Sequence, residues 1–311
     1  MQKMKLIIIL KKLINVLFLL TTKSISEYPL HKKSKRILVT NCKKYRDHIP
    51  KIVWMYWHDD TIPPLVSACI ARIKALNKKH VVNLVNNTNY KEYLPELSFP
   101  NENISVQLRA DIIRLELIYK FGGIWVDASI MFFEDFSWIT KISEENKYDF
   151  VGFYRERLTN NRKFPVIENW MFCAPPKNMF IKIWLETLKP AIHYGLDDFH
   201  KSLTYRKDYN EIKQNINIPV YLSAYLAAQI AAKKYSQLNA YLQCAESTAY
   251  YYHEKYPQKD FILEKVWCRY ETPKRLPPLI KLTSQNRHTI EKCDVISPKS
   301  IFGKFRESSK G

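Results

Sequence analysis

SVQLRADIIRLELIYKFGGIWVDAS, residues 105–129, has the pattern of a buried helix, a double-glycine stop, and a short strand that ends in a carboxylate. The apolar side chains of residues 105–120 recur with the spacing of a helix. The glycines at 122–123 suit its end, because a positive φ costs little only for glycine. The apolar residues 124–126 predict an interior strand, and Asp127 follows at its carboxyl end.

Five charged residues divide the predicted helix into two stripes. Arg109, Glu116 and Lys120 fall on one stripe, which we expect to face solvent, with the last two spaced for an ion pair. Asp111 and Arg114 fall on the opposite stripe, so they point inward or into a cleft. A buried charge is costly unless it is paired or used. Either a structural Asp–Arg pair or a binding site therefore explains them.

Asp127 has the position at which open α/β sheets bind ligands, the carboxyl end of a strand. The small residues Ala128 and Ser129 follow it. A carboxylate there suits a divalent cation that bridges to a diphosphate.

The segments around this stretch predict one α/β domain over residues 49–290. Apolar runs and turn residues bound the predicted strands, and helical spacing of apolar residues marks the predicted helices. Strands are predicted at 52–57, 81–85, 148–154 and 168–174, and helices at 63–77, 90–94, 178–194 and 219–235; residues 195–219 are expected to be loop-rich, and residues 250–253 to form a packed strand or a glycan-facing segment.

Residues 109–129, RADIIRLELIYKFGGIWVDAS, resemble the signature of the DXD-containing sugar transferases. These include fungal Golgi mannosyltransferases, the glucosylating domains of large bacterial toxins, and bacterial capsular polysaccharide synthesis proteins. The stretch resembles the motif of the capsular group most. The resemblance extends over residues 49–130. It implies a GT-A-like, Rossmann-type sheet that binds a nucleotide sugar, flanked by helices, with added C-terminal helices.

The resemblance also implies roles for the residues of this stretch. Asp111 and Arg114 are expected to contact the nucleotide sugar, and Asp127 to engage a divalent cation, Mn²⁺ or Mg²⁺, and the diphosphate. Ser129 stands where the second Asp of DXD is expected, so its place in the metal shell is a departure from that motif.

Residues outside the stretch receive roles from the same resemblance. Trp57 is expected to stack on the base of the nucleotide, although a core position is equally open. Asn169 is expected near the transferred sugar, and Glu168 is a weaker candidate for acceptor contact that is otherwise a surface charge. Lys281 is expected to neutralise the leaving diphosphate, and Ser284 to complete the metal shell.

The implied activity is hexosyl transfer, with retention of configuration, from a nucleotide-diphosphate sugar to a growing capsular or lipopolysaccharide-type glycan, free or lipid-linked. Two alternatives remain open at this point. One is a membrane-attached, non-catalytic glycan or scaffold protein with a degenerate transferase site. The other is a basic nucleic-acid-binding protein, but no recognised motif supports a nucleic-acid partner.

The formal charge of +19 indicates anionic partners. Residues 1–51 carry 13 lysine or arginine residues against Glu27 and Asp47, and residues 6–20 are mostly apolar. We expect residues 1–48 to be a basic, amphipathic segment that associates with an anionic membrane surface, and residues 291–311 to be a basic tail. The six scattered cysteines show no metal-binding spacing, so we expect a cytoplasmic protein on the inner face of the plasma membrane.

Overall fold

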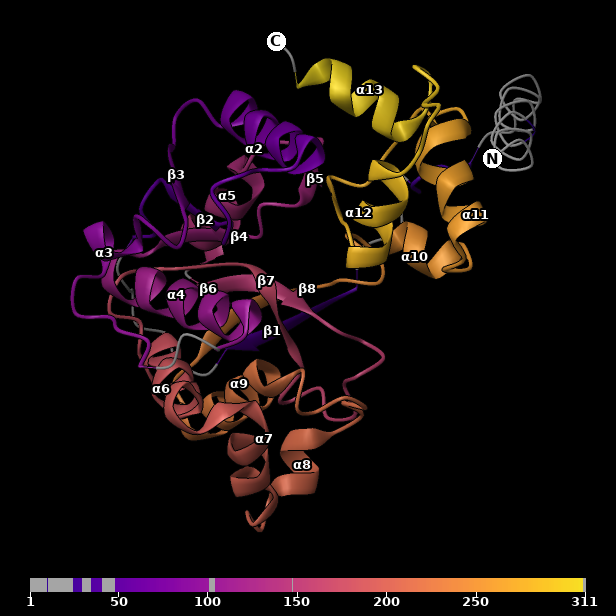
Figure 1. The fold of residues 1–311 in the computed structure, drawn as a ribbon. Helices are drawn as coiled ribbons and strands as arrows, with labels where there is room; N and C mark the ends of the chain where they lie inside the picture. The colour runs from indigo at the N-terminus through magenta and orange to yellow at the C-terminus, as the bar shows by residue number, and fades with distance from the viewer. Residues whose placement is uncertain are drawn as a thin grey trace, which may run out of the picture.

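A seven-stranded mixed sheet forms the centre of the computed structural model, with the strand order β1-β8-β6-β7-β4-β2-β3 (Figure 1). The structure describes residues 10, 25–29, 35–40, 48–100, 104–146 and 148–309. Strands β3, β2, β4, β6 and β8 run in one direction, and β7 and β1 run in the other. The strands are β1 (Arg36–Thr40), β2 (Ile52–Tyr56), β3 (Val81–Val85), β4 (Gly123–Val126), β6 (Phe150–Tyr154), β7 (Ile167–Ala174) and β8 (Asn239–Cys244).

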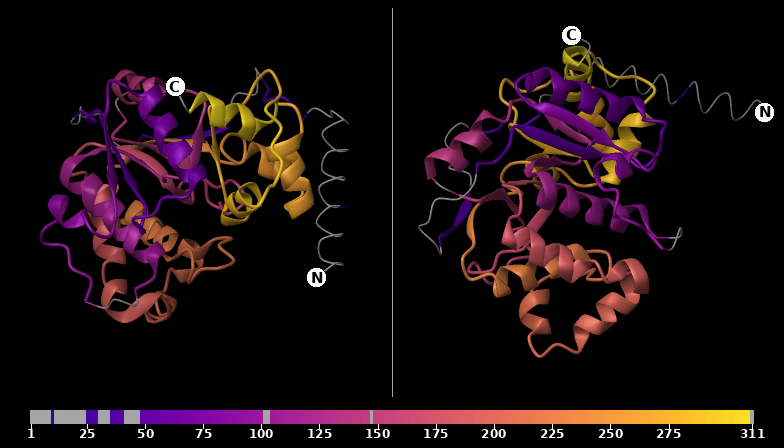
Figure 2. Two further views of the ribbon diagram at one scale, coloured as in Figure 1. Left: turned by 45° about the horizontal axis from the view of Figure 1, so that its top comes forward. Right: turned by 90° about the vertical axis from the view of Figure 1, so that its left-hand side faces the viewer.

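Helices cover both faces of this sheet, which confirms the predicted α/β class (Figures 1 and 2). In β2, Val53 and Met55 pack with the α2 side, whereas Trp54 and Tyr56 pack with the α4 side. This double burial explains why the strand is apolar throughout rather than alternating. The helices are α2 (Pro64–Leu76), α3 (Tyr90–Tyr93), α4 (Val106–Phe121), α5 (Ser137–Asn146), α6 (Met179–Leu188), α7 (Ala191–Thr204), α8 (Tyr209–Lys213), α9 (Ser223–Lys234), α10 (Tyr251–Lys255), α11 (Asp260–Glu264), the π-helix η1 (Lys265–Arg269), α12 (Ser284–Glu291) and α13 (Ile301–Ser308).

A second, two-stranded sheet joins the middle of the chain to its end. Strand β5 (Ile130–Phe132) pairs antiparallel with β9 (Leu279–Lys281), and Ile130 lies opposite Lys281. Because β5 starts three residues after Asp127, this pairing brings the late segment to the carboxyl end of β4.

The helix and stop that the sequence predicts are both present. Ser105 caps α4 by accepting a hydrogen bond from the backbone N–H of Leu108. Gly122 and Gly123 have φ values of 67° and 101°. A Cβ on Gly123 would lie 2.4 Å from the carbonyl oxygen of Ile52, so the close approach of β4 to β2 also requires glycine.

The solvent-facing stripe of α4 is only partly as predicted. Arg109 is buried, with its guanidinium 4.3 Å from the ring centre of Phe99, so the expectation that it faces solvent is wrong. Glu116 pairs with Lys189 rather than with Lys120. Arg109 makes a cation–π contact instead of facing solvent, and Glu116 pairs with a lysine outside α4 instead of with Lys120.

Several other segments differ from the predictions. Residues 195–219 are largely helical, in α7 and α8, and residues 250–253 lead into helix α10 rather than a strand. The helix predicted at 178–194 is broken into α6 and α7 at Pro190.

The chain termini also contribute to the fold. Arg36–Thr40, within the predicted N-terminal segment, form the edge strand β1 against β8. Helix α13, within the predicted basic tail, buries Ile301 and Phe305. Most of residues 1–48 lie outside the described residues. Within the described part of the chain, no helix has the length and apolar character needed to cross a bilayer.

Candidate active site

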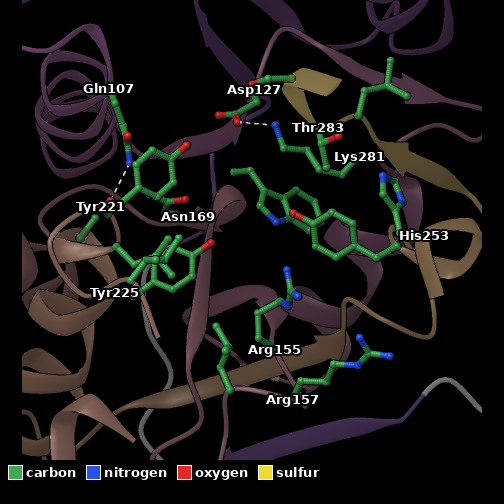
Figure 3. Close-up of a pocket in the computed structure, with 18 of the residues that line it drawn as sticks. Gln107, Asp127, Arg155, Arg157, Asn169, Tyr221, Tyr225, His253, Lys281 and Thr283 are labelled. Atoms are coloured by element: carbon green, nitrogen blue, oxygen red, sulfur yellow. Dashed lines mark hydrogen bonds and ion pairs between the residues drawn. The ribbon is translucent and has the colours of Figure 1, made fainter. Parts of the chain in front are cut away.

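A cleft of about 1010 Å³ opens at the carboxyl ends of the parallel strands (Figure 3). Helix α4, the end of β4, the start of β7, the segment after β6, and the β9–α12 segment all contribute lining residues. Because β7 is antiparallel to β4 and β6, its first residues lie at the same sheet edge as their ends. The topology thus collects polar side chains from distant parts of the sequence at one place.

Asp127 lies in this cleft with both carboxylate oxygens engaged. Its Oδ2 accepts a hydrogen bond from Lys281 Nζ at 2.8 Å, as Figure 3 shows. Its Oδ1 lies 3.4 Å from Arg114 Nη2 and accepts a hydrogen bond from Trp125 Nε1 at 3.2 Å. Burial raises the pKa of Asp127, but Lys281 and Arg114 lower it by more, so the pKa lies below its ordinary value and the group is ionised.

Asp111 and Arg114 face the cleft from α4, as the stripe pattern predicts. Arg114 Nη2 lies 3.3 Å from Asp111 Oδ1, and its Nη1 donates to the carbonyl oxygen of Asn169 at 2.5 Å. Asn169 Nδ2 donates to Asp111 Oδ1 at 2.9 Å. Burial raises the pKa of Asp111 to about 6, with Arg114 lowering it and Asp127 raising it. The structure therefore joins Asp111, Arg114, Asn169 and Asp127 through the single guanidinium of Arg114.

Glu168 is fully buried, so its reading as a surface charge is wrong. Its Oε1 lies 3.5 Å from Arg155 Nη1, and its Oε2 accepts a short hydrogen bond from the hydroxyl of Tyr225. Arg155 Nε also pairs with Glu246 Oε1 at 3.1 Å. Burial raises the pKa of Glu168, and Arg155 and Tyr225 lower it, with a net rise. Arg155 and Tyr225 line the cleft and hold this carboxylate behind its wall.

The wall from β9 to α12 adds hydroxyl and cationic groups. Lys281 and Ser284 both line the cleft, as does Arg287 one turn further along α12. Arg287 Nη1 donates to Ser129 Oγ at 3.0 Å and Nη2 to Ser284 Oγ at 3.4 Å. Thr283 caps α12 through a reciprocal pair of hydrogen bonds with Asn286. The turn that carries Ser284 is therefore held by side-chain hydrogen bonds.

The predicted metal ligands do not form a donor set that fits a divalent cation. Ser129 is buried, does not line the cleft, and its oxygen is engaged by Arg287. Ser284 lines the cleft, but its hydroxyl also contacts Arg287. Over the described ranges of the chain, no three His, Cys, Asp or Glu side chains are grouped to hold a metal ion. Mn²⁺ and Mg²⁺ prefer sites rich in anionic oxygen, whereas two cations occupy this one.

Trp57, the predicted platform for the base, is not among the residues that line the cleft. Its ring packs with the apolar cluster on the α2 side of the sheet, and the guanidinium of Arg287 lies 5.9 Å from the ring centre. Trp57 is only partly buried, so both the base-stacking role and the core position stay predictions.

Several residues of the cleft have no role predicted from the sequence. One signal was available for Arg155, because it directly follows a predicted strand that ends at the same sheet edge as Asp127. Tyr250 and His253 belong to residues 250–253, for which the sequence leaves a glycan-facing segment open, and both line the cleft at the start of α10. No comparable signal marks Tyr225, which lies on α9. Burial lowers the pKa of His253 to about 4, so this imidazole is neutral near pH 7.

Comparison with known proteins finds relatives among glycosyltransferases. The chain is 32% identical over 158 residues to the O-glycosyltransferase braB of Annulohypoxylon truncatum. The aligned region covers 45% of this chain and 37% of the relative. It therefore spans well under half the length of that protein. Among solved structures, "PaToxG Glycosyltransferase" aligns with 88% of this chain and 90% of its own, at 14% identity and a TM-score of 0.32.

The family comparison covers most of the chain. Residues 8–252 match the family described as capsular polysaccharide synthesis protein. The match includes Asp111, Arg114, Asp127 and Asn169 and stops before the β9–α12 wall. The chain belongs to the capsular polysaccharide synthesis protein family and, with it, to the superfamily of glycosyltransferases that its central stretch resembles.

Proposed function

We propose that this protein is a glycosyltransferase that transfers a hexose from a nucleotide-diphosphate sugar to a hydroxyl group of a growing cell-surface glycan. The observation that supports it best is the convergence of Asp111, Arg114, Asn169, Asp127 and Lys281 in one open cleft. A purely structural Asp–Arg pair requires no open cleft with further polar groups around it. The name of the relative, O-glycosyltransferase, agrees with a hydroxyl acceptor.

In this proposal the two cations on Asp127 act on the leaving group. The bond from the anomeric carbon to the diphosphate oxygen breaks, and negative charge grows on the diphosphate. Lys281 and Arg114 are held within 3.4 Å of Asp127 and so are already oriented before the donor arrives. Fixed charges of this kind stabilise a transition state without reorganising. Asp111 and Asn169, hydrogen-bonded to each other, orient hydroxyl groups of the donor.

The acceptor is proposed to enter along the opposite wall of the cleft. Ile218 and Tyr221 line that wall and are 52% and 58% exposed, although both are large and apolar. Gln107 Nε2 donates to the carbonyl oxygen of Tyr221 at 2.8 Å, which ties this wall to α4 (Figure 3). An exposed aromatic ring beside a polar cleft suits the apolar face of a sugar ring.

The test is a hydrolysis screen of UDP- and GDP-hexoses with released nucleotide as the readout. We expect turnover of at least one donor, and a loss of about 10² or more for Asp111→Asn and for Arg114→Met. Glu116→Gln is the matched control, because it changes an acid of the same helix that faces Lys189 instead of the cleft. If no nucleotide sugar is turned over or raises the melting temperature, the non-catalytic scaffold is the better description.

The stereochemical outcome is a separate part of the proposal. The family resemblance favours retention, so an α-linked donor is expected to give an α-linked product. The anomeric coupling constant of the first product formed, measured by NMR, checks this, and a β-linked product would show inversion.

We also propose that the protein works at an anionic membrane surface, on the cytoplasmic side. The support is the charge of residues 1–51 and the amphipathic pattern of residues 6–20.

A further inference from the structure

Asp127 occupies the position at which a divalent cation is expected in sugar transferases of this type, yet its partners are cations of the chain itself. Lys281 holds Oδ2, while Arg114 and Trp125 Nε1 hold Oδ1. A metal ion at Asp127 has to displace Lys281 or lie within a few ångströms of its ammonium. A unit positive charge and a double positive charge at so short a distance repel each other strongly.

The second position of the motif shows the same replacement. Ser129 has no charge, and its hydroxyl accepts a hydrogen bond from Arg287 Nη1 at 3.0 Å. Arg287 itself lines the cleft, and its guanidinium donates to the hydroxyls of Ser129 and Ser284. The cleft therefore has a guanidinium beside the residue at which a second carboxylate would hold the metal. Lys281 and Arg287 together supply two positive charges, the same number as a divalent ion.

Other carboxylates of the cleft are already engaged. Asp111 contacts Arg114 and Asn169, and Glu254 is paired with Arg157. Neither lies in a group of three possible ligands anywhere in the ranges that the structure describes.

Both the backbone and the side chain of Lys281 are held in place by neighbouring segments. It belongs to β9, where it is registered opposite Ile130, three residues after Asp127. Its backbone N–H donates to the carbonyl oxygen of Ala249 at 3.1 Å, and its side chain is only 13% exposed. A lysine held from two sides in this way needs little reorganisation when the diphosphate binds.

We infer that this transferase works without a divalent cation, and that the Lys281 ammonium, supported by Arg287, neutralises the diphosphate in its place. The inference rests on the proposed function. When the bond to the anomeric carbon breaks, the electron pair stays on the diphosphate oxygen, and Lys281 and Arg287 stabilise the charge without transferring a proton to it. Asp127 then holds Lys281 in position rather than holding a metal.

The first experiment measures donor hydrolysis by the full chain after treatment with EDTA and exchange into metal-free buffer. We expect the rate with UDP- or GDP-hexose to stay within twofold of the rate in millimolar Mn²⁺ or Mg²⁺. Loss of activity with EDTA that Mn²⁺ restores would overturn the inference while leaving the proposed function intact. Absence of hydrolysis with and without metal would instead count against the proposed function.

A second measurement does not depend on turnover. Mn²⁺ is titrated into the protein, alone and with UDP or GDP, and the melting temperature is followed. We expect the nucleotide diphosphate to raise the melting temperature equally with and without Mn²⁺. An increase that requires Mn²⁺ would contradict the inference even if no donor is hydrolysed.

Two variants separate the specific effect of Lys281 from the general effect of losing one positive charge. Lys281→Met is expected to lower kcat for donor hydrolysis by about 10²–10³, as removal of a fixed transition-state donor does. It should also abolish stabilisation by the nucleotide diphosphate. Lys182→Met is the control, since Lys182 pairs with Glu186 on α6 and does not line the cleft. Equal nucleotide binding and turnover by Lys281→Met and the control would overturn the role of Lys281.

Discussion

At the scale of single residues, Asp111 has a pKa that its surroundings pull in opposite directions. Burial raises the pKa to about 6, and the ionised Asp127 adds to this, whereas Arg114 works against it. An acid whose pKa is higher in the folded state binds a proton more tightly there than in the unfolded chain. Its contribution to stability is therefore fully present below the ordinary value of 3.8 and is lost as pH rises through about 6.

This loss of stability with rising pH gives a prediction for Asp111→Asn, which keeps the shape of the side chain and removes its titratable carboxyl group. Between pH 4 and pH 7, the free energy of unfolding of the wild type should fall relative to that of the variant by roughly 2–3 kcal/mol. Urea unfolding at both pH values measures the difference. Glu116→Gln, on the outer side of the same helix, should show no such change relative to the wild type. A difference between wild type and Asp111→Asn that is constant with pH would contradict the raised pKa.

At the scale of elements, the connection from α4 to β4 fixes the site, because Asp127 lies only four residues beyond the second glycine. Gly123 combines a φ of 101° with a position at which a Cβ would lie 2.4 Å from Ile52 O. Gly195 also has a positive φ, 80°, but nothing lies within 4 Å of a Cβ placed there. The two glycines therefore separate the cost of backbone strain from the cost of a clash.

Gly195→Ala should cost about 1–3 kcal/mol of stability, the cost of holding a residue with a side chain in this positive-φ conformation. Gly123→Ala should cost several kcal/mol more, because β4 must move away from β2 as well. Thermal melts of both variants measure this, and donor hydrolysis by Gly123→Ala should fall with the displacement of Asp127. Similar losses of melting temperature for the two variants would indicate that strand packing tolerates the added methyl group.

The wall proposed for the acceptor belongs to the segment between α8 and α9, and Tyr221 is its most exposed aromatic lining residue. Tyr221→Ala should raise the apparent KM for a glycoside acceptor about tenfold and leave acceptor-independent donor hydrolysis unchanged. Tyr205→Ala is the matched control, because Tyr205, at the end of α7, is 79% exposed and does not line the cleft. A loss of donor hydrolysis in Tyr221→Ala would place this residue on the donor side instead.

The same elements explain how far the sequence alone leads. It predicts α4, the glycine stop and β4 correctly, because periodicity and glycine chemistry are local. The sequence also predicts that Asp111, Arg114 and Asp127 lie at one edge of the sheet, because the short α4–β4 connection fixes the direction of β4 relative to α4. Asp127 and Lys281 are 154 residues apart, and their contact depends on the β5–β9 pairing, which no local pattern contains.

Other failures of prediction have equally specific causes. Tyr250–His253 have no clear period, so nothing in the sequence favours α10 over a strand. Helical spacing predicts that Arg109 faces solvent, but Phe99 from the preceding segment covers its guanidinium. The burial of Glu168 depends on its contacts with Arg155 and Tyr225, which come from different elements, so it could not be predicted from the residues around Glu168.

At the scale of the whole molecule, the early and late parts of the chain meet beside the C-terminal helices. Ile25 is buried, Tyr28 N donates to the carbonyl oxygen of Arg275 at 3.1 Å, and Glu27 pairs with Arg275. Residues 25–29 and β1 are thus part of the folded body. A deletion that tests membrane association must end before them, and residues 1–23 meet this condition.

Deleting residues 1–23 removes five lysines and no acidic residue. Each lysine near an anionic surface contributes about 1 kcal/mol, so binding to phosphatidylglycerol vesicles should weaken at least tenfold in a sedimentation assay. The body of the protein retains Ile25 and β1, so its melting temperature and donor hydrolysis should not change. A full-length variant with these five lysines changed to glutamine separates charge from apolar insertion: if it binds like the deletion, electrostatic attraction dominates. Undiminished vesicle binding by the deletion would instead locate the membrane-binding surface on the folded body, where most of the remaining excess of positive charge lies.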